Sequence, residues 1–137
     1  MQSETGESVE NLNLKGTQED DEIWGMAGND RISGLAGNDI INGGAGNDYI
    51  VGGEGADALS GGDGDDRLIA DADDTLIDGG DGFDRLIVRD SRGITLDQFA
   101  ASIERAEGGD GDDVFDASGF DTKIDQVGGG GNDVLIA

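Results

Sequence analysis

Large apolar residues recur along this chain with a fixed period of nine. Isoleucine or leucine occupies every ninth position from residue 14 to residue 86: Leu14, Ile23, Ile32, Ile41, Ile50, Leu59, Leu68, Ile77 and Leu86. Each is the middle residue of a short segment that we interpret as a strand, with this side chain pointing to the core and its neighbours pointing outward. One such side chain cannot form a core alone, so the nonapeptides must stack. The period therefore predicts a β-solenoid.

Glycine and aspartate fill the positions between these strands. An aspartate stands two residues before most of the periodic apolar residues: Asp21, Asp30, Asp39, Asp48, Asp57, Asp66 and Asp84. Glycines precede it, as in GGAGND (43–48) and GGDGDD (61–66). Glycine permits sharp turns with φ > 0, and such turns aim carbonyl oxygens inward beside the aspartate. Several hard oxygen ligands are what Ca²⁺ prefers, so the repeat indicates calcium binding.

The charge of the chain supports a role for cations. The sequence has 32 acidic and 8 basic residues, a formal net charge of −24. Such a chain repels itself and, without counter-ions, resembles a disordered polyanion. Divalent ions bound by the regularly spaced carboxylates would offset this charge. An acidic disordered spacer is the alternative, but it predicts no nine-residue register.

Composition argues against several functional classes. Nucleic acid is not an expected partner, because phosphate binding needs clustered Lys and Arg. The chain has no histidine and no cysteine, which excludes a Ser-His-Asp triad, an H-E-x-x-H motif and a thiol nucleophile. We therefore expect no enzymatic activity. No apolar stretch approaches the ~18 residues of a transmembrane helix, and residues 1–10 lack the features of a cleaved secretory signal.

The register divides the chain into four parts. We expect a tail and capping half-turn at 1–15, a first repeat block at 16–87, an insertion at 88–107 and a second repeat block at 108–137. The seventh nonapeptide (70–78) has lost its glycines and carries Thr75 in place of the aspartate, so we expect a weak or empty metal site there. In the second block Phe115 and Ile124 keep the phase, and Gln126 and Val127 form a two-residue insertion. Because the pattern runs to the last residue, we expect a module from a longer protein.

The insertion carries the start signals of a helix. Thr95 would be the N-cap with Gln98 as its capping-box partner, and Ile94 would pack on Phe99. The apolar residues follow helical spacing at Leu96, Phe99, Ala100 and Ile103. These signals predict one short α-helix over 95–102. For residues 103–107 both helix and strand are compatible with the sequence. SIERAEGG (102–109) is similar to SVENLNLKG (8–16), so it could also be a strand that leads into the second block.

With GGxGxD motifs at 43, 61, 79 and 108, the chain resembles the RTX (repeats-in-toxin, haemolysin-type) calcium-binding family over 16–87 and in part over 108–136. The resemblance implies an all-β right-handed parallel β-roll in which two nonapeptides make one 18-residue turn. Each loop then stacks on the loop two units later, with Ca²⁺ between them. The first loop provides its second- and fourth-position carbonyls and its aspartate. The second loop provides its first- and third-position carbonyls and its aspartate.

On this chain the resemblance implies two stacks of sites. One stack pairs the aspartates Asp30 with Asp48, Asp48 with Asp66, and Asp66 with Asp84. The carbonyls of its three sites would come from Met26, Gly28, Gly43 and Ala45; from Gly44, Gly46, Gly61 and Asp63; and from Gly62, Gly64, Gly79 and Asp81. The other stack pairs Asp21 with Asp39 and Asp39 with Asp57, while Asp113 and Asp133 share a site across a 20-residue offset. We expect about five to seven Ca²⁺ per chain.

The resemblance also implies the role of the chain. It would be a calcium-binding module of a larger secreted bacterial protein, disordered without Ca²⁺, that passes through a type I secretion machinery and folds on extracellular Ca²⁺. Calcium ions would then stabilise the fold by cross-linking the chain, as disulfides do in other secreted proteins. The alternative is an adhesin or carbohydrate-binding accessory module, since solenoid faces form extended surfaces. Sugar platforms need exposed aromatics, and this chain offers only Trp24, Tyr49 and a few phenylalanines. Of these we expect Trp24 and Tyr49 to face outward and Phe115 to lie in the core. Exposed solenoid ends also permit end-to-end self-association.

Overall fold

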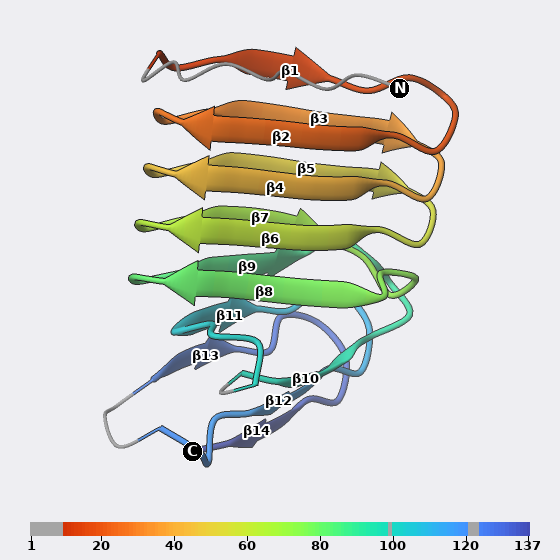
Figure 1. Cartoon of the computed structure of the whole chain (residues 1–137). Coiled ribbons are helices and arrows are strands. Elements are labelled where there is room, and N and C mark those ends of the chain that lie inside the picture. The colour runs from red at the N-terminus through yellow and green to blue at the C-terminus, as the bar shows by residue number, and fades with distance from the viewer. Residues whose placement is uncertain (1–9, 99, 121–123) are drawn as a thin grey trace.

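The chain winds into a β-solenoid. The computed structural model describes residues 10–98, 100–120 and 124–137. These residues form an all-β parallel solenoid of about seven turns with about 18 residues per turn (Figure 1). The predicted solenoid is therefore confirmed. The expected tail at 1–6 and the first part of the capping half-turn lie outside the described residues.

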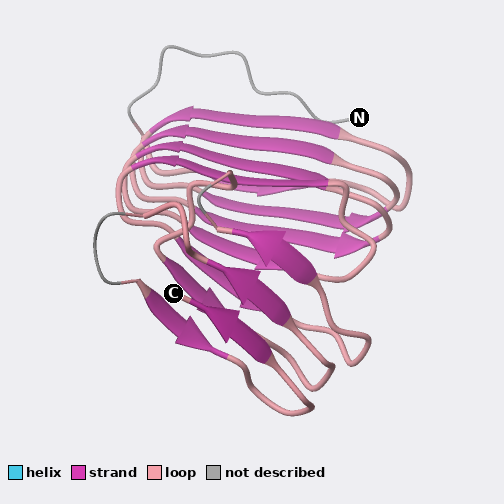
Figure 2. Cartoon of the chain, turned by 90° about the horizontal axis from the view of Figure 1, so that it is seen from below, coloured by secondary structure: helices cyan, strands magenta, loops and turns pink. Residues whose placement is uncertain are grey.

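Three parallel sheets form the walls of the solenoid (Figure 2). The first sheet contains, in spatial order, β1 (Asn13–Lys15), β3 (Arg31–Ala36), β5 (Tyr49–Glu54), β7 (Arg67–Ala70), β9 (Arg85–Val88), β11 (Arg105–Glu107) and β13 (Asp125–Val127). The second sheet contains β2 (Glu22–Ala27), β4 (Ile40–Ala45), β6 (Ala58–Asp63) and β8 (Leu76–Asp81). The third sheet contains β10 (Thr95–Asp97), β12 (Val114–Asp116) and β14 (Val134–Ile136). Successive strands alternate between walls, so a strand pairs with the strand two places further along the sequence, except that the second sheet ends at β8 and the third begins at β10.

The periodic apolar residues form the core between the walls. Ile32 pairs with Ile50 and Ile50 with Leu68 across the first sheet, and Ile23 pairs with Ile41 in the second. All nine residues of the series are buried except Ile77, which is partly buried and packs against the same cluster. Burying one such side chain stabilises the fold by about 1.5–3 kcal/mol. Each nonapeptide contributes only one large apolar side chain of this series to the core, so the loops must also contribute to the free energy of folding.

The helix predicted over 95–102 is wrong for the residues that the structure describes there. Thr95 begins strand β10, which pairs with β12, and turns follow at 98 and 100–102. Phe99 lies outside the described residues. The ladder prevails over the local helix signals because it places Leu96 beside Phe115 and buries Ile103 in the core. The alternative interpretation of the second half is confirmed, since strand β11 occupies 105–107.

The phase predicted for Ile124 is also wrong. The first sheet pairs Leu86 with Ala106 and Ala106 with Gln126, each at an offset of 20 residues. Gln126 and Val127 therefore belong to strand β13, and Gln126 takes the inward position expected for Ile124. The amide of Gln126 donates hydrogen bonds to the oxygens of Gln98, Phe115 and Ile136, which explains why a polar residue fits this position. Phe115 is fully buried, as predicted.

Candidate metal centre

The aspartates of the repeats form ladders along the edges of the solenoid. In the first ladder the Asp30 N–H donates to Asp48 Oδ1 at 2.7 Å, Asp48 to Asp66 at 2.7 Å, and Asp66 to Asp84 at 2.8 Å. The second ladder joins Asp21 to Asp39 and Asp39 to Asp57, each at 2.8 Å. Asp113 donates to Asp133 Oδ1 at 3.0 Å across the longer offset. The structure thus brings together every aspartate pair that the repeat pattern predicted.

Six of these aspartates bury a carboxylate oxygen that receives no hydrogen bond from any residue within 10–98, 100–120 and 124–137. They are Asp30, Asp39, Asp48, Asp57, Asp66 and Asp84, each at most 2 % exposed, and the oxygen in question is Oδ2. A buried carboxylate oxygen without a partner is costly. A cation bound between the loops would give each of these oxygens a partner. The donor chemistry therefore fits Ca²⁺.

The first glycine of each loop leaves room beside this oxygen. A Cβ added to Gly43 would collide with Asp48 Oδ2 and would lie 2.7 Å from the carbonyl oxygen of Gly61 on the next loop. A Cβ added to Gly61 would collide in the same way with Asp66 Oδ2 and the carbonyl oxygen of Gly79. The aspartate oxygen and the first-position carbonyl of the following loop therefore adjoin a space that only glycine keeps open.

The other predicted carbonyls also lie between stacked loops. Ala45 O accepts a hydrogen bond from Gly28 N at 2.8 Å, and Asp63 O accepts one from Gly46 N at 2.8 Å. A carbonyl oxygen has two lone pairs, so such an acceptor can still bind a cation. Met26 adopts φ +80°, close to the +105° of Gly44, although it carries a side chain. Leu35, at the same loop position, has φ +82°, so the glycine conformation is kept at these two loops although glycine is absent.

Two carboxylates per pair, supplemented by carbonyls, are the donor set that these loops offer. Among the residues that the structure describes, no group of three or more His, Cys, Asp or Glu side chains is placed to hold a metal ion. An ion at these loops must therefore take many of its ligands from the backbone, which suits the six to eight oxygens that Ca²⁺ accepts.

Burial raises the pKa of five of the ladder carboxyls. The pKa of Asp66 rises to about 6 and that of Asp84 to about 7, first through burial and then through neighbouring negative charges. The pKa values of Asp39, Asp48 and Asp57 are raised for the same first reason. Without a cation, the charged form of each carboxylate is thus disfavoured in the folded loop.

These shifts predict that, without calcium, acid stabilises the fold. The pKa values of Asp66 and Asp84 are higher in the folded chain than their ordinary value of 3.8. The folded chain therefore holds protons that the unfolded chain has released between about pH 4 and about pH 7, and the free energy of unfolding falls as the pH rises through this window. Calcium-free protein should show more β-structure by circular dichroism at about pH 5 than at about pH 8.

The matched variant for this pH dependence is Asp84→Asn, which stays neutral at both pH values and should show a smaller difference. With calcium present the sign should reverse, because protons compete with the ion for the same oxygens. A calcium-free chain that is more structured at the higher pH would contradict this interpretation.

A second, exposed ladder runs beside the aspartates and was not predicted. The residue before each aspartate is often Asn or Asp, and its side chain accepts the N–H of the equivalent residue one turn later. Asn29 N–H donates to Asn11 Oδ1, Asn47 to Asn29, and Asp65 to Asn47, at 2.8–2.9 Å. Asn38 and Asn132 make the same contact with Asp20 and Asp112. The recurrent Asn or Asp at the fifth position was the signal for it.

The aspartate ladders also use two acids that the repeat pattern does not mark. Asp74, one residue before Thr75, accepts the N–H of Asp57 at 3.1 Å. Glu104 accepts the N–H of Asp84 at 2.7 Å through its longer side chain. Each of these acids has one signal in the sequence. Asp74 stands one residue before the position that the motif gives to aspartate, and Glu104 stands just before strand β11 with a side chain one methylene longer than that of aspartate.

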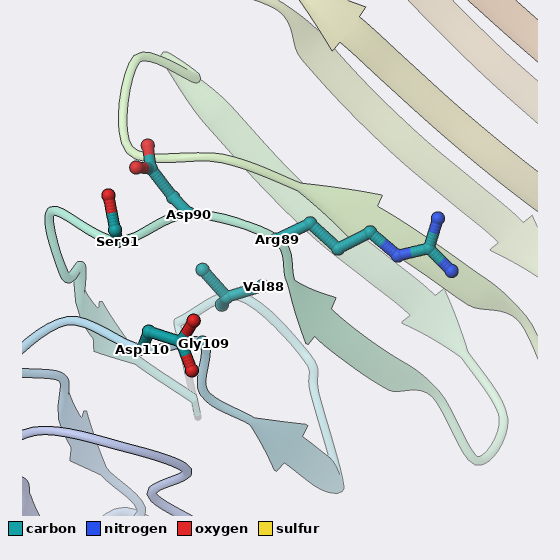
Figure 3. Close-up of a pocket in the computed structure, with 6 residues that line it drawn as sticks. All are labelled: Val88, Arg89, Asp90, Ser91, Gly109 and Asp110. Atoms are coloured by element: carbon teal, nitrogen blue, oxygen red, sulfur yellow. The ribbon is translucent and has the colours of Figure 1, made fainter.

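A surface pocket where the 18-residue spacing ends offers no comparable site. This pocket of about 420 Å³ is lined by Val88, Arg89, Asp90, Ser91, Gly109 and Asp110. The Arg89 side chain extends away from the carboxylates of Asp90 and Asp110 (Figure 3). Asp90, next to Ser91, is bound instead by Arg92, whose guanidinium holds the pKa of Asp90 well below its usual range. The acid next to Ser91 is therefore already paired with a cation.

Trp24 and Tyr49, the two aromatics expected to face outward, lie in different sheets, and Phe83 is exposed as well. Tyr49 lies between Arg31 and Arg67, whose guanidinium carbons are 4.5 and 5.4 Å from its ring centroid. Trp24 is exposed on β2, in the other sheet. The cations beside the Tyr49 ring favour cross-strand packing as its role.

The stacked loops, their buried carboxylates and their inward carbonyls define a calcium-binding β-solenoid. The chain belongs to the RTX calcium-binding nonapeptide repeat family, whose model matches it in four copies at 15–50, 51–86, 103–122 and 127–137. No match was found among curated proteins or among solved structures. Within the described residues, no helix has the length and apolar character needed to cross a membrane. The predicted family is thus confirmed, and calcium binding follows from it.

Proposed function

We propose that this β-roll is the calcium-folded module of a larger secreted bacterial protein. The observation that carries the proposal is the set of six buried carboxylate oxygens without hydrogen-bond partners. Together with a net charge of −24, they disfavour the folded chain unless cations are bound. Because complete sites exist only between stacked loops, the free energy of ion binding becomes free energy of folding.

The ligands we propose follow the aspartate pairs and the carbonyls around them. Asp48 and Asp66 each belong to two successive sites of the first ladder, and Asp39 belongs to two sites of the second. Each Ca²⁺ would supply the positive charge that allows two buried carboxylates to face one another across a turn. Four carbonyls from the two loops, such as those of Gly44, Gly46, Gly61 and Asp63, would complete the coordination. About five to seven ions per chain would bind in this way.

The same coupling suits export through a type I secretion machinery. We expect the chain to remain unfolded at cytosolic calcium and to fold into a right-handed roll at the ~10⁻⁴–10⁻³ M of extracellular sites. The two repeat blocks (16–87 and 108–137) would fold together, because strand β11 of the connecting segment continues the first sheet between them. Folding outside the cell would oppose return of the chain.

Removal of calcium is expected to unfold the chain reversibly. The far-UV circular dichroism spectrum should change from β-structure to coil when a chelator is added at neutral pH, and should recover when millimolar calcium is restored. Magnesium at the same concentration is the control, because Mg²⁺ demands octahedral geometry and dehydrates reluctantly. A chain that keeps its β-spectrum in excess chelator would overturn the proposal.

A further inference from the structure

We propose that Asp74 completes a calcium site in the one turn whose repeat motif is degenerate, with Asp57 on the preceding turn as its partner carboxylate. This inference rests on the proposed function and adds a ligand to it. By the repeat pattern the seventh nonapeptide has no carboxylate at its sixth position, which is Thr75. The structure places the neighbouring acid there instead.

The hydrogen bonds of this loop are displaced by one residue relative to the regular turns. In a regular turn the aspartate accepts the N–H of the preceding aspartate, and the next residue donates its N–H to the carbonyl of that preceding aspartate. Ala58 N, for example, donates to Asp39 O at 2.8 Å. Here Asp74 Oδ1 accepts the N–H of Asp57 at 3.1 Å, and Asp57 O accepts the N–H of Thr75 at 2.8 Å as well as that of Leu76 at 3.4 Å. Leu76 pairs with Ala58, so strand β8 keeps the regular register, while Asp74 takes the hydrogen-bond role that the aspartate has in a regular turn.

The carboxylate of Asp57, the proposed partner of Asp74, has a buried oxygen that accepts no hydrogen bond within the described part of the chain. Asp57 is 0 % exposed, and its Oδ2 has no hydrogen-bond partner. A Cβ added to Gly52 would collide with Asp57 Oδ2, as one added to Gly34 would with Asp39 Oδ2. The oxygen thus has the same place in its own loop as in the turns with intact motifs. Asp57 and Asp74 together supply the pair of carboxylates found at every other site.

Contacts on the outer side replace the glycines that this loop lacks. Asp74 Oδ2 accepts the N–H of Asp71 at 2.9 Å, and Asp90 Oδ2 accepts the N–H of Ala72 at 3.0 Å. Asp73 points outward, where both of its oxygens pair with Arg92 at 2.8 and 2.9 Å. These bonds fix the loop without φ > 0 turns, so that Asp74 faces Asp57 and Asp73 faces solvent.

The test compares bound calcium among three single variants of the full chain. Native mass spectrometry at saturating calcium counts the ions, and isothermal titration calorimetry checks the count in solution. Asp74→Asn should bind one ion fewer than the wild type, because it loses a negative ligand but keeps an oxygen for the Asp57 N–H. Asp73→Asn, the same change at the adjacent outward residue, should bind the wild-type number. Thr75→Asp should gain no ion, because the position is already filled.

The outcomes separate this inference from the proposed function. An Asp74→Asn chain with the wild-type ion count, or a Thr75→Asp chain with one additional ion, would overturn the Asp74 site while calcium binding itself stood. A wild type that binds no calcium would overturn the proposed function. If Asp74→Asn does not fold, the Thr75→Asp count still decides, since an empty turn would acquire a site from that substitution and a filled one would not.

Discussion

Replacing Asp48 with alanine is expected to disable two adjacent calcium sites at once. Asp48 accepts the N–H of Asp30 on one side and donates its own N–H to Asp66 on the other. At free calcium tenfold above the dissociation constant, each lost ion removes about 1.4 kcal/mol of stabilisation, so two remove about 3 kcal/mol. The three to five remaining ions must together supply the lost stabilisation, so the calcium concentration at the midpoint of folding should rise about three- to fivefold, as followed by circular dichroism.

The matched control for Asp48→Ala is Asp63→Ala. Asp63 has the same charge and lies in the next loop of the same stack, but it is exposed, and only its backbone carbonyl is a proposed ligand. Alanine keeps that carbonyl, so the midpoint should shift little. Equal shifts for the two variants would show that the effect reflects net charge alone and not bridging by a shared carboxylate.

Replacing Gly44 with alanine is expected to disrupt the centre of the roll. Gly44 has φ +105°, which disfavours any residue with a Cβ, and a Cβ there would collide with the carbonyl oxygen of Met26. That oxygen is also a proposed ligand of the site above. The strain and the displaced carbonyl together should cost about 3 kcal/mol or more in the free energy of unfolding, measured by urea denaturation in saturating calcium.

Gly130→Ala is the control that separates conformation from composition. Gly130 lies in the last described loop, and the nearest atoms to a Cβ there belong to Asp110, at 3.3 and 3.4 Å. The backbone at Gly130 is not in the positive-φ region. The loss should stay below about 1 kcal/mol. Similar losses at Gly44 and Gly130 would contradict the special geometry assigned to the second loop position.

Where the nine-residue register is intact, the sequence predicted the fold and the aspartates that lie one above another. The period of the apolar residues predicts stacked strands, and the 18-residue turn implied by the family resemblance determines which strands pair. The pairs Asp30–Asp48 and Asp48–Asp66 follow directly, because an 18-residue turn permits no other partner for these side chains. In a repeat protein the long-range contacts can be predicted from the sequence, since every repeat contacts the next one in the same way.

Where the register breaks, local signals were misleading. Residues 95–102 carry a capping box and a helical apolar stripe, yet Thr95 enters a strand because β12 offers a ladder partner and a core position for Leu96. Gln126 was assigned to an insertion because the nine-residue count from Phe115 places Ile124 in phase, whereas the amide of Gln126 donates hydrogen bonds to three oxygens in the roll. Neither contact is encoded by neighbours in the sequence, so periodicity could not reveal it.

Asp74 and Glu104, the two acids that replace the motif aspartate, also could not be predicted from the repeat pattern. Asp74 reaches the ladder only because the loop from Ala70 to Thr75 is displaced by one residue and held from outside by Asp90. Glu104 reaches it because a longer side chain compensates for a changed loop. A fixed motif counts both turns as lost, while the physical requirement is only a carboxylate oxygen near the N–H of the preceding aspartate.

Calcium-coupled folding is tested most directly by the number of ions taken up as the chain folds. The measurement is the thermal unfolding temperature of the full chain over a range of buffered free calcium from about 10 μM to about 10 mM. The unfolding temperature should rise with every tenfold increase in calcium, with a slope that corresponds to the uptake of several ions per chain. A folded chain whose unfolding temperature is the same in chelator and at the highest calcium concentration would contradict calcium-coupled folding.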